Sequence, residues 1–465
     1  GVSGEYTIKN SIRFNDNDSA YMSRTPGSAS SSRKKWTWSG WLKRGTLGNT
    51  GSPDGYKRFF NVKSDSNNYF ISGFLGDSSD GFNVTAREGG SEVLKFETSR
   101  KFRDVSAWYH IVMAFDSTNA LGSDRFKVYF NGQRDTTALG TTPSLNTELV
   151  VLENVIHNIG RDNHSGTTYY YDGYMTEIQL IDGYAYGPEY FGKFSSDLIW
   201  VPIEYSGSYG SNGFYLKGSN SGSLGADSSG NGNNFTTSGL AANDQKIDTP
   251  TNNQITFNPL NNQRSGGTPS NGNLDYVGPG TRTLISLTAN IPSTGKWAIA
   301  FKVAQVSTNV GWQFGITKAT NSSFGDAAGS NEDVGSSDGV RMDPSSSDLY
   351  LYDYVNSTGI DPSLPLTTSD EFWIAVDMAT GKCFLGIYDE SATTMKFVAA
   401  DTALDGNPAT GDNPTATISD MIGSTEYTFA VGSKQTSQHV YLQRSTDVSG
   451  TTPSGYTYFE NVKDI

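Results

Sequence analysis

Several residue types and patterns are scarce in this 465-residue sequence, and each scarcity excludes a class of protein. The single cysteine, Cys383, excludes an internal disulfide. Apolar residues nowhere recur at helical spacing for more than about two turns, so we expect almost no long helix and no coiled-coil stalk. No apolar run reaches the roughly 18 residues of a transmembrane helix, so no membrane insertion is expected.

Positive charge is scarce as well. Lys and Arg total 34 against 48 Asp and Glu, which gives a formal net charge of -14. Non-specific nucleic-acid binding depends on cationic side chains that neutralise phosphates, so no nucleic-acid partner is expected. Because the acidic residues are spread evenly, solubility and mutual repulsion on a crowded surface are favoured over an acidic recognition tail.

Residues that could hold a metal are few. The four histidines show no H-x-x-x-H or H-x-H spacing, and a lone cysteine adds nothing to a soft metal site. Residues 227–232 begin like a calcium loop, but Ser238 stands where a bidentate Glu is required, which favours an Asx-rich turn. The stretch 15–18 is interpreted as a solvated hairpin tip rather than a cation cage. We expect no cofactor; calcium stays an open alternative, with unknown ligands.

Residues 1–11 are polar and contain neither the basic region nor the apolar stretch of a secretory signal. This pattern, together with the lack of cystines, predicts synthesis in a reducing cytoplasm. Cys383 lies in an apolar segment, which favours a buried small hydrophobic residue over a reactive thiol.

What the sequence does contain is typical of an all-β protein. Its 52 glycines and its abundant Ser, Thr, Asn and Asp suit tight turns between short strands. We predict two antiparallel, jelly-roll-like β-sandwich domains over residues 1–220 and 254–465, joined by a Gly/Ser/Asn-rich linker over 221–253. Alternation predicts strands at residues 36–42, 108–116, 126–130, 169–181, 214–216, 297–303, 312–316, 349–354, 372–377, 383–388, 427–431 and 439–442.

The clearest alternation lies in residues 36–42. A period of two puts Trp36, Trp38 and Leu42 on one face, predicted to be core, and Trp41 on the other. Asn131-Gly132 predicts a two-residue hairpin turn, because both positions need positive φ. Residues 169–181 predict a further strand pair around Asp172-Gly173.

The first half resembles the laminin-G-like branch of the concanavalin A-like lectin and glucanase superfamily. Four of that family's motifs occur in order, at Trp36–Trp41, Trp108–Asp116, Tyr129–Gly132 and Tyr171–Ile178. The family's frequent Asp before the Glu of the last motif is Thr176 here, which removes one calcium ligand that the resemblance would imply.

Two further resemblances cover other parts of the chain. Polar segments of the first half, including residues 209–216, 227–235 and 248–253, look like a recurrent cassette in predicted tail and virion proteins of marine bacteriophages. The second half is similar to SPRY-type sandwiches through residues 295–297, 312–316 and 372–388. In SPRY-like folds loops contact peptides or proteins, so the polar segment Asn321–Asp338 is either such a loop or a tolerated surface loop.

Sugar binding needs an aromatic platform beside hydrogen-bonding amides and carboxylates. The candidates are an outward-facing tryptophan and a polar and aromatic cluster before the last motif: Trp41, Asp162, Asn163, Tyr169, Tyr170 and Tyr171. The alternative is that these aromatics pack against the linker, the other domain or a neighbouring subunit.

The resemblances imply a non-enzymatic bacteriophage virion structural protein on the virion surface, as a capsid decoration, head fibre or tail fibre component. Its expected partners are other virion proteins, further copies of itself in a homo-oligomer and host-surface polysaccharide. A free carbohydrate-binding or adhesion module is the alternative. A glycoside hydrolase is less favoured, because the E-x-D-x-E triplet of laminarinase-type enzymes is absent from the sequence.

Overall fold

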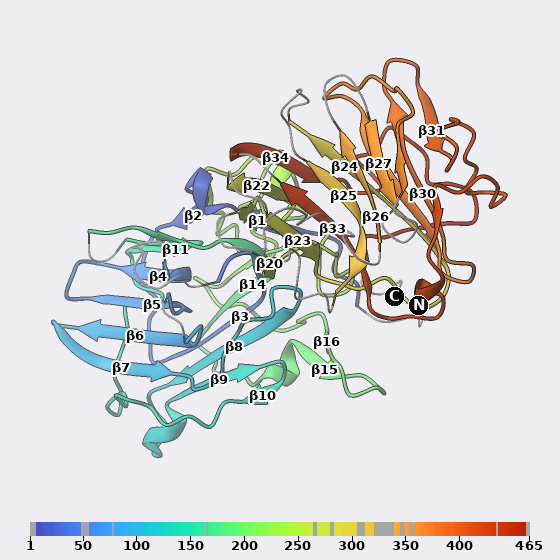
Figure 1. Ribbon diagram of the computed structural model, residues 1–465. Helices are drawn as coiled ribbons and strands as arrows, with labels where there is room; N and C mark the ends of the chain where they lie inside the picture. The colour runs from blue at the N-terminus through green and yellow to red at the C-terminus, as the bar shows by residue number, and fades with distance from the viewer. Residues whose placement is uncertain are drawn as a thin grey trace. The chain divides into compact units, whose positions relative to one another are not determined.

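The computed structural model describes residues 6–47, 55–76, 79–163, 166–263, 267–279, 283–304, 312–319, 339–344, 349–353, 358–433 and 436–461 (Figure 1). Residue contacts divide the chain into two compact units, unit 1 (Gly1–Asn253) and unit 2 (Gln254–Ile465). No helix in these ranges is long and apolar enough to cross a membrane. The helical elements found there are short 3-10 turns: η1 (Asp16–Asp18), η3 (Gly122–Asp124), η4 (Pro188–Tyr190), η5 (Ala242–Asp244) and η6 (Ser419–Met421).

Unit 1 contains two large antiparallel sheets. The first sheet has the order β10 (Gln133–Arg134), β9 (Phe126–Phe130), β8 (Trp108–Asp116), β3 (Lys35–Arg44), β14 (Gly173–Asp182), β1 (Ser11–Phe14) and β19 (Gln245–Lys246), and β17 (Phe214–Leu216) pairs with β14. The second has the order β18 (Thr236–Ser238), β2 (Tyr21–Arg24), β11 (Ile156–Ile159), β4 (Lys57–Lys63), β5 (Tyr69–Phe74), β6 (Phe82–Glu88) and β7 (Ser91–Glu97). Two small ribbons pair β12 (Arg161–Asp162) with β13 (Tyr169–Tyr170), and β15 (Gly192–Phe194) with β16 (Trp200–Pro202).

The core of unit 1 lies between its two large sheets. Trp36 of β3 packs edge-on against Phe70 of β5, with ring centroids 5.3 Å apart. Trp36, Trp38 and Leu42 are fully buried in this core, whereas Trp41 belongs to a separate cluster on the other face of the sheet. The predicted alternation of β3 is therefore confirmed.

Residues 221–253, where a linker is predicted, lie within unit 1 in the structure. Strand β18 pairs with β2, and β19 pairs with β1. Leu224 and Phe235 are buried in the core, and the polar residues around them satisfy their backbone groups through turns. Residues 221–253 thus have the composition of a linker but fold onto unit 1, where two of their few apolar side chains reach the core. We call them the covering segment.

The strand pair predicted around Asp172-Gly173 is wrong in its pairing. Both strands exist, but β13 pairs with β12 whereas β14 pairs with β1 and β3. Gly173 adopts φ +137° where the chain crosses close to β3, and a Cβ there would lie 2.1 Å from the Lys43 carbonyl oxygen. The glycine therefore serves a close backbone approach and not a hairpin turn.

Unit 2 repeats the architecture of two sheets. The first has the order β20 (Phe257–Gln263), β23 (Thr283–Leu287), β33 (Tyr427–Ser433), β25 (Gln313–Lys318), β26 (Val340–Pro344), β27 (Leu349–Asp353) and β28 (Thr358–Ile360). The second has the order β21 (Thr268–Ser270), β22 (Asp275–Pro279), β34 (Thr436–Leu442), β24 (Lys296–Val303), β29 (Glu371–Asp377), β30 (Lys382–Asp389) and β31 (Thr394–Val398). In addition β32 (Ala416–Thr417) pairs with β30, and β35 (Thr457–Tyr458) runs parallel to β24.

Aromatic contacts join the two sheets of unit 2. Phe314 of β25 stacks on Phe301 of β24 and on Phe372 of β29, with centroids 5.3 and 5.1 Å apart. The strands predicted at 372–377 and 383–388 are confirmed as β29 and β30, which pair as a hairpin, and Cys383 on β30 is fully buried as expected. The all-β prediction with two antiparallel sandwiches is therefore confirmed, while the predicted loop Asn321–Asp338 lies outside the described residues.

Candidate functional site

The predicted site residues are distributed over different parts of unit 1. Asp162 and Tyr171 lie in the interior. The Asp162 carboxylate accepts a hydrogen bond from Asn61 Nδ2 at 2.9 Å and lies 4.0 Å from Arg58 Nε, while the Tyr171 hydroxyl donates to the Lys43 carbonyl at 2.9 Å. Both side chains are thus taken up by structural contacts and do not face solvent.

The other three members of that cluster stay near the surface. Tyr169 packs edge-on against Tyr56, Tyr170 lies against Tyr21, and Lys63 Nζ donates to the Asn163 carbonyl. These residues are half-buried around the ribbon of β12 and β13, next to β4. Their role in binding stays a prediction, and they do not line the hollow that contains Trp41.

Trp41 lies at the floor of an aromatic hollow of about 440 Å³ on the outer face of the first sheet. We call it the Trp41 hollow. Its walls come from β3, β8, the turn after β9, the ribbon of β15 and β16, and the end of unit 1. The lining residues are Trp41, Arg100, Trp108, Phe130, Asn131, Gln133, Phe194, Leu198, Ile199, Trp200, Pro250 and Asn253.

The floor follows from strand alternation. Trp41 on β3 is the register partner of His110 on β8, and their rings stack at 4.8 Å. Trp200 stacks on the same imidazole and donates its Nε1–H to His110 Nδ1 at 3.0 Å. Because an indole can only donate, Nδ1 accepts and the proton lies on Nε2, which donates to Ser39 Oγ. Burial lowers the pKa of His110 to about 3, so the ring is neutral.

Two glycines make room for Trp200. A Cβ at Gly132 would lie 2.3 Å from the indole ring, and a Cβ at Gly192 would lie 2.4 Å from it. Gly132 (φ +79°) and Asn131 (φ +47°) form the predicted hairpin turn, which is confirmed. The turn therefore sets both the end of the β9–β10 hairpin and one wall of the hollow.

The polar groups of the hollow are amides and one guanidinium. The Asn131 side chain accepts a hydrogen bond from the His110 backbone, while Gln133 is exposed. Arg100, whose guanidinium lies 5.5 Å from the Phe130 ring centroid, carries the charge among the described residues of the lining. Aromatic faces beside amides and a cation can bind a hydroxyl-rich or acidic ring.

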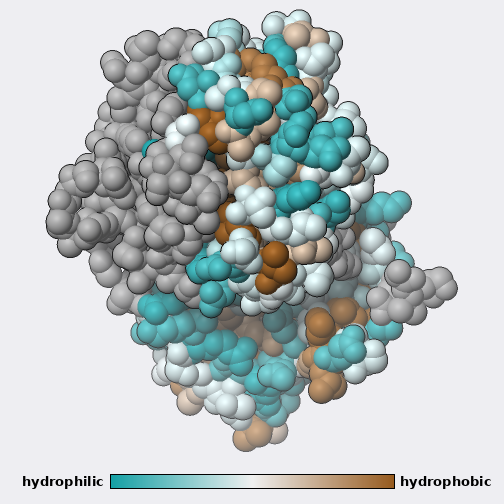
Figure 2. All heavy atoms as spheres, turned by 45° about the vertical axis from the view of Figure 1, so that its right-hand side comes forward, coloured by the Kyte–Doolittle hydropathy of each residue, from teal (hydrophilic) through white to brown (hydrophobic). Residues whose placement is uncertain are grey.

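The rim of the hollow is apolar and exposed. Phe194, on β15, is 46% exposed and meets Trp200 edge-on at 5.0 Å. Leu198 and Ile199, at the tip of the same ribbon, are 81% and 62% exposed. Elsewhere hydrophobic residues are scattered; Figure 2 shows them, on one face, as small groups among hydrophilic ones. Exposed apolar side chains beside an aromatic floor are typical of a binding surface.

A second hollow of about 560 Å³ in unit 1 surrounds a buried carboxyl group, Glu177. Tyr6 and Tyr215 donate hydroxyl hydrogen bonds to it, and burial raises its pKa. Glu177 also adopts φ +52° at a bulge in β14, a conformation that is strained for a side chain of this kind. Among the described residues of this lining, Glu177 is the one that carries a carboxyl group.

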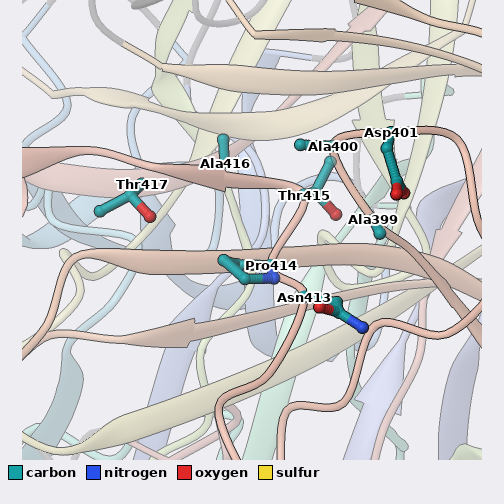
Figure 3. Close-up of a pocket in the computed structure, with 8 residues that line it drawn as sticks. All are labelled: Ala399, Ala400, Asp401, Asn413, Pro414, Thr415, Ala416 and Thr417. Atoms are coloured by element: carbon teal, nitrogen blue, oxygen red, sulfur yellow. The ribbon is translucent and has the colours of Figure 1, made fainter.

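Unit 2 has a hollow of about 450 Å³ of different character. Figure 3 shows its lining residues, which come from residues 399–401 after β31 and from residues 413–417 leading into β32. Alanines, threonines and a proline predominate, with Asp401 and Asn413 at the surface. Without an aromatic face it lacks the main attraction for a sugar ring.

Hydrogen bonds within the chain occupy the oxygen atoms of the stretch that begins like a calcium loop. The Asp227 carboxylate accepts hydrogen bonds from the backbone of Ser229 and Asn233 and from the Ser229 hydroxyl, which confirms the predicted Asx turn. No group of three or more metal-ligating side chains occurs among the described residues. Calcium binding stays a prediction without assigned ligands.

Sequence reasoning identified Trp41 but missed most residues around it. Trp108 falls in a predicted strand without a site role, and Trp200 lies outside the predicted strands. The available signals were the outward position of Trp108 in the alternation of β8 and the aromatic and apolar residues of 191–200. Neither signal shows that the ribbon folds back onto the turn at Gly132.

Comparisons with solved structures give low identities over sandwich folds. The native heptameric SAP-like pentraxin from Limulus polyphemus is 14% identical, covering 39% of this chain and 79% of that chain, with a TM-score of 0.29. Domains LG4-5 of the mouse laminin alpha1 chain are 9% identical, covering 99% and 90%, with a TM-score of 0.31. The SPRY domain of human HERC1 is 16% identical, covering 40% and 96%, with a TM-score of 0.24.

No curated protein matches this sequence. A family model does match a part of unit 1 that contains the strands with the ordered motifs. Residues 16–185, all within unit 1, match Laminin_G_3, the model described as Concanavalin A-like lectin/glucanases superfamily.

Proposed function

We propose that this protein is a non-enzymatic carbohydrate-binding surface protein and that the Trp41 hollow of unit 1 holds the glycan. One observation carries the proposal: aromatic rings, amides and a guanidinium meet in one open hollow on a lectin-like sandwich. The C–H face of a sugar ring packs on aromatic rings, while its hydroxyls exchange hydrogen bonds with amides. The apolar rim at Phe194 extends this surface outward.

We further propose that the protein is a structural component of a bacteriophage virion, displayed as a capsid decoration, head fibre or tail fibre. The polar cassette at residues 209–216, 227–235 and 248–253 supports this reading through its likeness to predicted virion proteins. A hollow open to solvent gives weak binding per site, and many copies on one particle convert weak sites into high avidity. Homo-oligomers and other virion proteins are the partners that such display requires.

The glycan proposal is tested on an array of bacterial-surface polysaccharides. Wild-type protein is expected to bind a subset, and Phe194→Ala to weaken that binding about tenfold, the effect of losing an aromatic contact worth about 1–1.5 kcal/mol. Phe194 is a better target than Trp41, because Trp41 is buried and its removal would leave a cavity. Tyr184→Ala is the matched control, since Tyr184 is a similarly exposed aromatic that does not line the hollow.

Three results would overturn the proposal. Wild type that binds no glycan removes the lectin function, and equal losses in Phe194→Ala and Tyr184→Ala remove the assignment to the hollow. New reducing ends on a bound glycan after prolonged incubation would overturn the non-enzymatic part. For the virion part, mass spectrometry of purified particles is expected to find the chain at stoichiometric copy number, and its absence there contradicts that part alone.

A further inference from the structure

A buried lysine of unit 1 lies against both a carboxylate and a side-chain amide. Lys43 Nζ is 2.9 Å from Asp248 Oδ2 and 2.9 Å from Asn253 Oδ1. The side chains of Lys43 and Asp248 are 1% and 3% exposed. Lys43 comes from the middle of the first sheet, on β3 between β8 and β14, and Asn253 is the last residue of unit 1.

The orientation of each group is set by a further contact. Asn253 Nδ2 donates to the Ser106 carbonyl at 2.8 Å, so its oxygen faces the lysine and its nitrogen faces away. Trp108 Nε1 donates to Asp248 Oδ1 at 3.0 Å, which leaves Oδ2 for Lys43. Around them Trp41, Trp108 and Tyr174 form an apolar cluster. The buried lysine and proton acceptor are thus held beside the half-buried amide of Asn253.

We propose that Lys43 and Asn253 form an intramolecular amide bond, with Asp248 as the proton carrier. Asp248 takes a proton from the Lys43 ammonium group, and the neutral amine attacks Cγ of Asn253. The new Nζ–Cγ bond forms, a proton passes through Asp248 to Nδ2, and the Cγ–Nδ2 bond breaks. Ammonia leaves, and no oxidant, metal or cofactor is consumed.

Physical reasons favour this step at this position. The Asp248 carboxylate, 2.9 Å from Lys43 Nζ, is placed to accept the proton whose removal gives the nucleophilic amine. Nζ in hydrogen-bond contact with the amide oxygen is close to the adjoining carbonyl carbon, and positioned groups react with effective molarities of roughly 10⁵ M or more. The Ser106 carbonyl accepts a hydrogen bond from the leaving nitrogen, Asn253 Nδ2, and so keeps the amide in one orientation.

The amide bond would give unit 1 a covalent crosslink, which the sequence does not provide through cysteines. The chain has one cysteine and no internal disulfide. The covering segment that ends at Asn253 also forms part of the Trp41 hollow, through Pro250 and Asn253. A covalent link to β3 would keep this segment attached to the first sheet when a mechanical force acts on unit 2. The force would then pass through the amide bond to the centre of that sheet.

The intact mass of the full-length purified protein tests the proposal. Wild type is expected to be lighter than its sequence by the mass of one ammonia molecule, and digestion is expected to yield a branched peptide that joins residues 43 and 253. Asn253→Ala and Lys43→Gln are each expected to have the mass of their sequences. Asn252→Ala, a change at the neighbouring asparagine, is expected to keep the loss; circular dichroism checks that each variant is folded.

Loss of ammonia can also arise from a succinimide at an Asn-Gly pair such as Asn131-Gly132. A succinimide hydrolyses in mild alkali, whereas an amide crosslink persists, so the treated protein distinguishes the two. Wild type at its full sequence mass overturns the proposal. A loss that persists in Asn253→Ala, or that disappears in mild alkali, overturns it equally, because the lost ammonia then comes from another residue.

Discussion

The two units cover the outer face of one of their sheets in different ways. In unit 1 the covering segment is attached by buried polar contacts, of Lys43 with Asp248 and of Arg13 with Asp244. In unit 2 the covered face of β24, β29 and β30 is built from alanines and aromatic rings, and Tyr458 packs on it. The first cover thus makes lysine–carboxylate and arginine–carboxylate contacts with its sheet. The second packs an aromatic ring on small residues and is also held by Glu371, whose carboxylate accepts hydrogen bonds from the backbone of Ser449 and Gly450.

The comparison explains why unit 1 carries the proposed glycan site. Large aromatic residues on the outer face of β3 and β8 are only partly covered, so their edges form the floor of an open hollow. In unit 2, small residues allow the cover to lie close, and the hollow found there is lined by alanine and threonine. The proposed glycan site and the buried Arg13–Asp244 pair thus belong to the same unit.

Breaking a charge pair of unit 1 is expected to have the largest effect. Arg13 and Asp244 are 5% and 4% exposed, and Arg13 donates two hydrogen bonds to Asp244 Oδ1 at 3.1 and 2.7 Å. Asp244→Ala leaves a buried guanidinium without its partner, so the free energy of unfolding should fall by about 3–5 kcal/mol. Urea unfolding followed by tryptophan fluorescence measures the loss.

The double variant Arg13→Met with Asp244→Leu is the control for that experiment. Removing both charges removes the unpaired group, so most of the stability should return. A double variant as unstable as Asp244→Ala would show that shape and not charge governs this contact. The unfolding transition of unit 2 should be unchanged in both variants.

The pH dependence of stability is the second property in which the units are expected to differ. His157 of unit 1 is buried and neutral: its Nδ1–H donates to the Val155 carbonyl, and its Nε2 accepts from the Leu152 backbone. Burial, aided by Arg24, lowers its pKa to about 4. Because the folded pKa lies below the unfolded value of about 6.5, this contribution is full above pH 6.5 and is lost as pH falls toward 4, by about 3 kcal/mol.

A comparison of wild type with His157→Gln isolates the contribution of His157 to the free energy of unfolding. The difference in unfolding free energy between the two proteins should shrink steadily from pH 7 to pH 4, since only wild type gains a proton on unfolding in that range. Denaturation curves at several pH values provide the measurement. A difference that stays constant with pH would mean that His157 is protonated in the folded protein.

Strand positions could be read from the sequence because alternation is a local property. The two faces of β3, the β29–β30 hairpin and the Asn131-Gly132 turn all depend on neighbouring residues, and all are confirmed. The burial of Asp162 was not readable, because its partners Asn61 and Arg58 lie about a hundred residues away.

The site was only partly readable for a related reason. Trp41 was found through its outward position on β3, but the contact of Trp200 with Gly132 joins segments without a shared periodicity. The segment 221–253 misled because its polar composition is that of a linker, whereas two buried residues, Leu224 and Phe235, fix it to the core. Composition gives the number of apolar residues in a segment, but it does not show whether those residues are buried in the core.

Alanine substitutions at two glycines test whether the turn at Gly132 shapes the Trp41 hollow. Gly132→Ala would place a Cβ against the Trp200 ring at φ +79°, and it should cost about 2 kcal/mol and weaken glycan binding. Gly89→Ala is matched, since Gly89 has φ +58° but no atom within 4 Å of the added Cβ. It should cost about 1 kcal/mol and leave binding intact. Thermal unfolding and the glycan array measure both effects, and equal behaviour of the two variants would contradict a wall formed by Trp200.

The smallest expected effect concerns the rim of the hollow, at Leu198. This residue is 81% exposed and adopts φ +61°, so it combines an unfavourable backbone conformation with an unburied apolar side chain. Asparagine tolerates that conformation better, so Leu198→Asn should raise the free energy of unfolding by about 0.5 kcal/mol. If the rim contacts the glycan, the same variant should bind severalfold more weakly, and stability and binding would move in opposite directions. Thermal unfolding and glycan-array binding, measured on one preparation, test whether Leu198 contacts the glycan. A variant that gains stability but binds as wild type does would restrict the glycan site to the floor around Trp41 and Trp200.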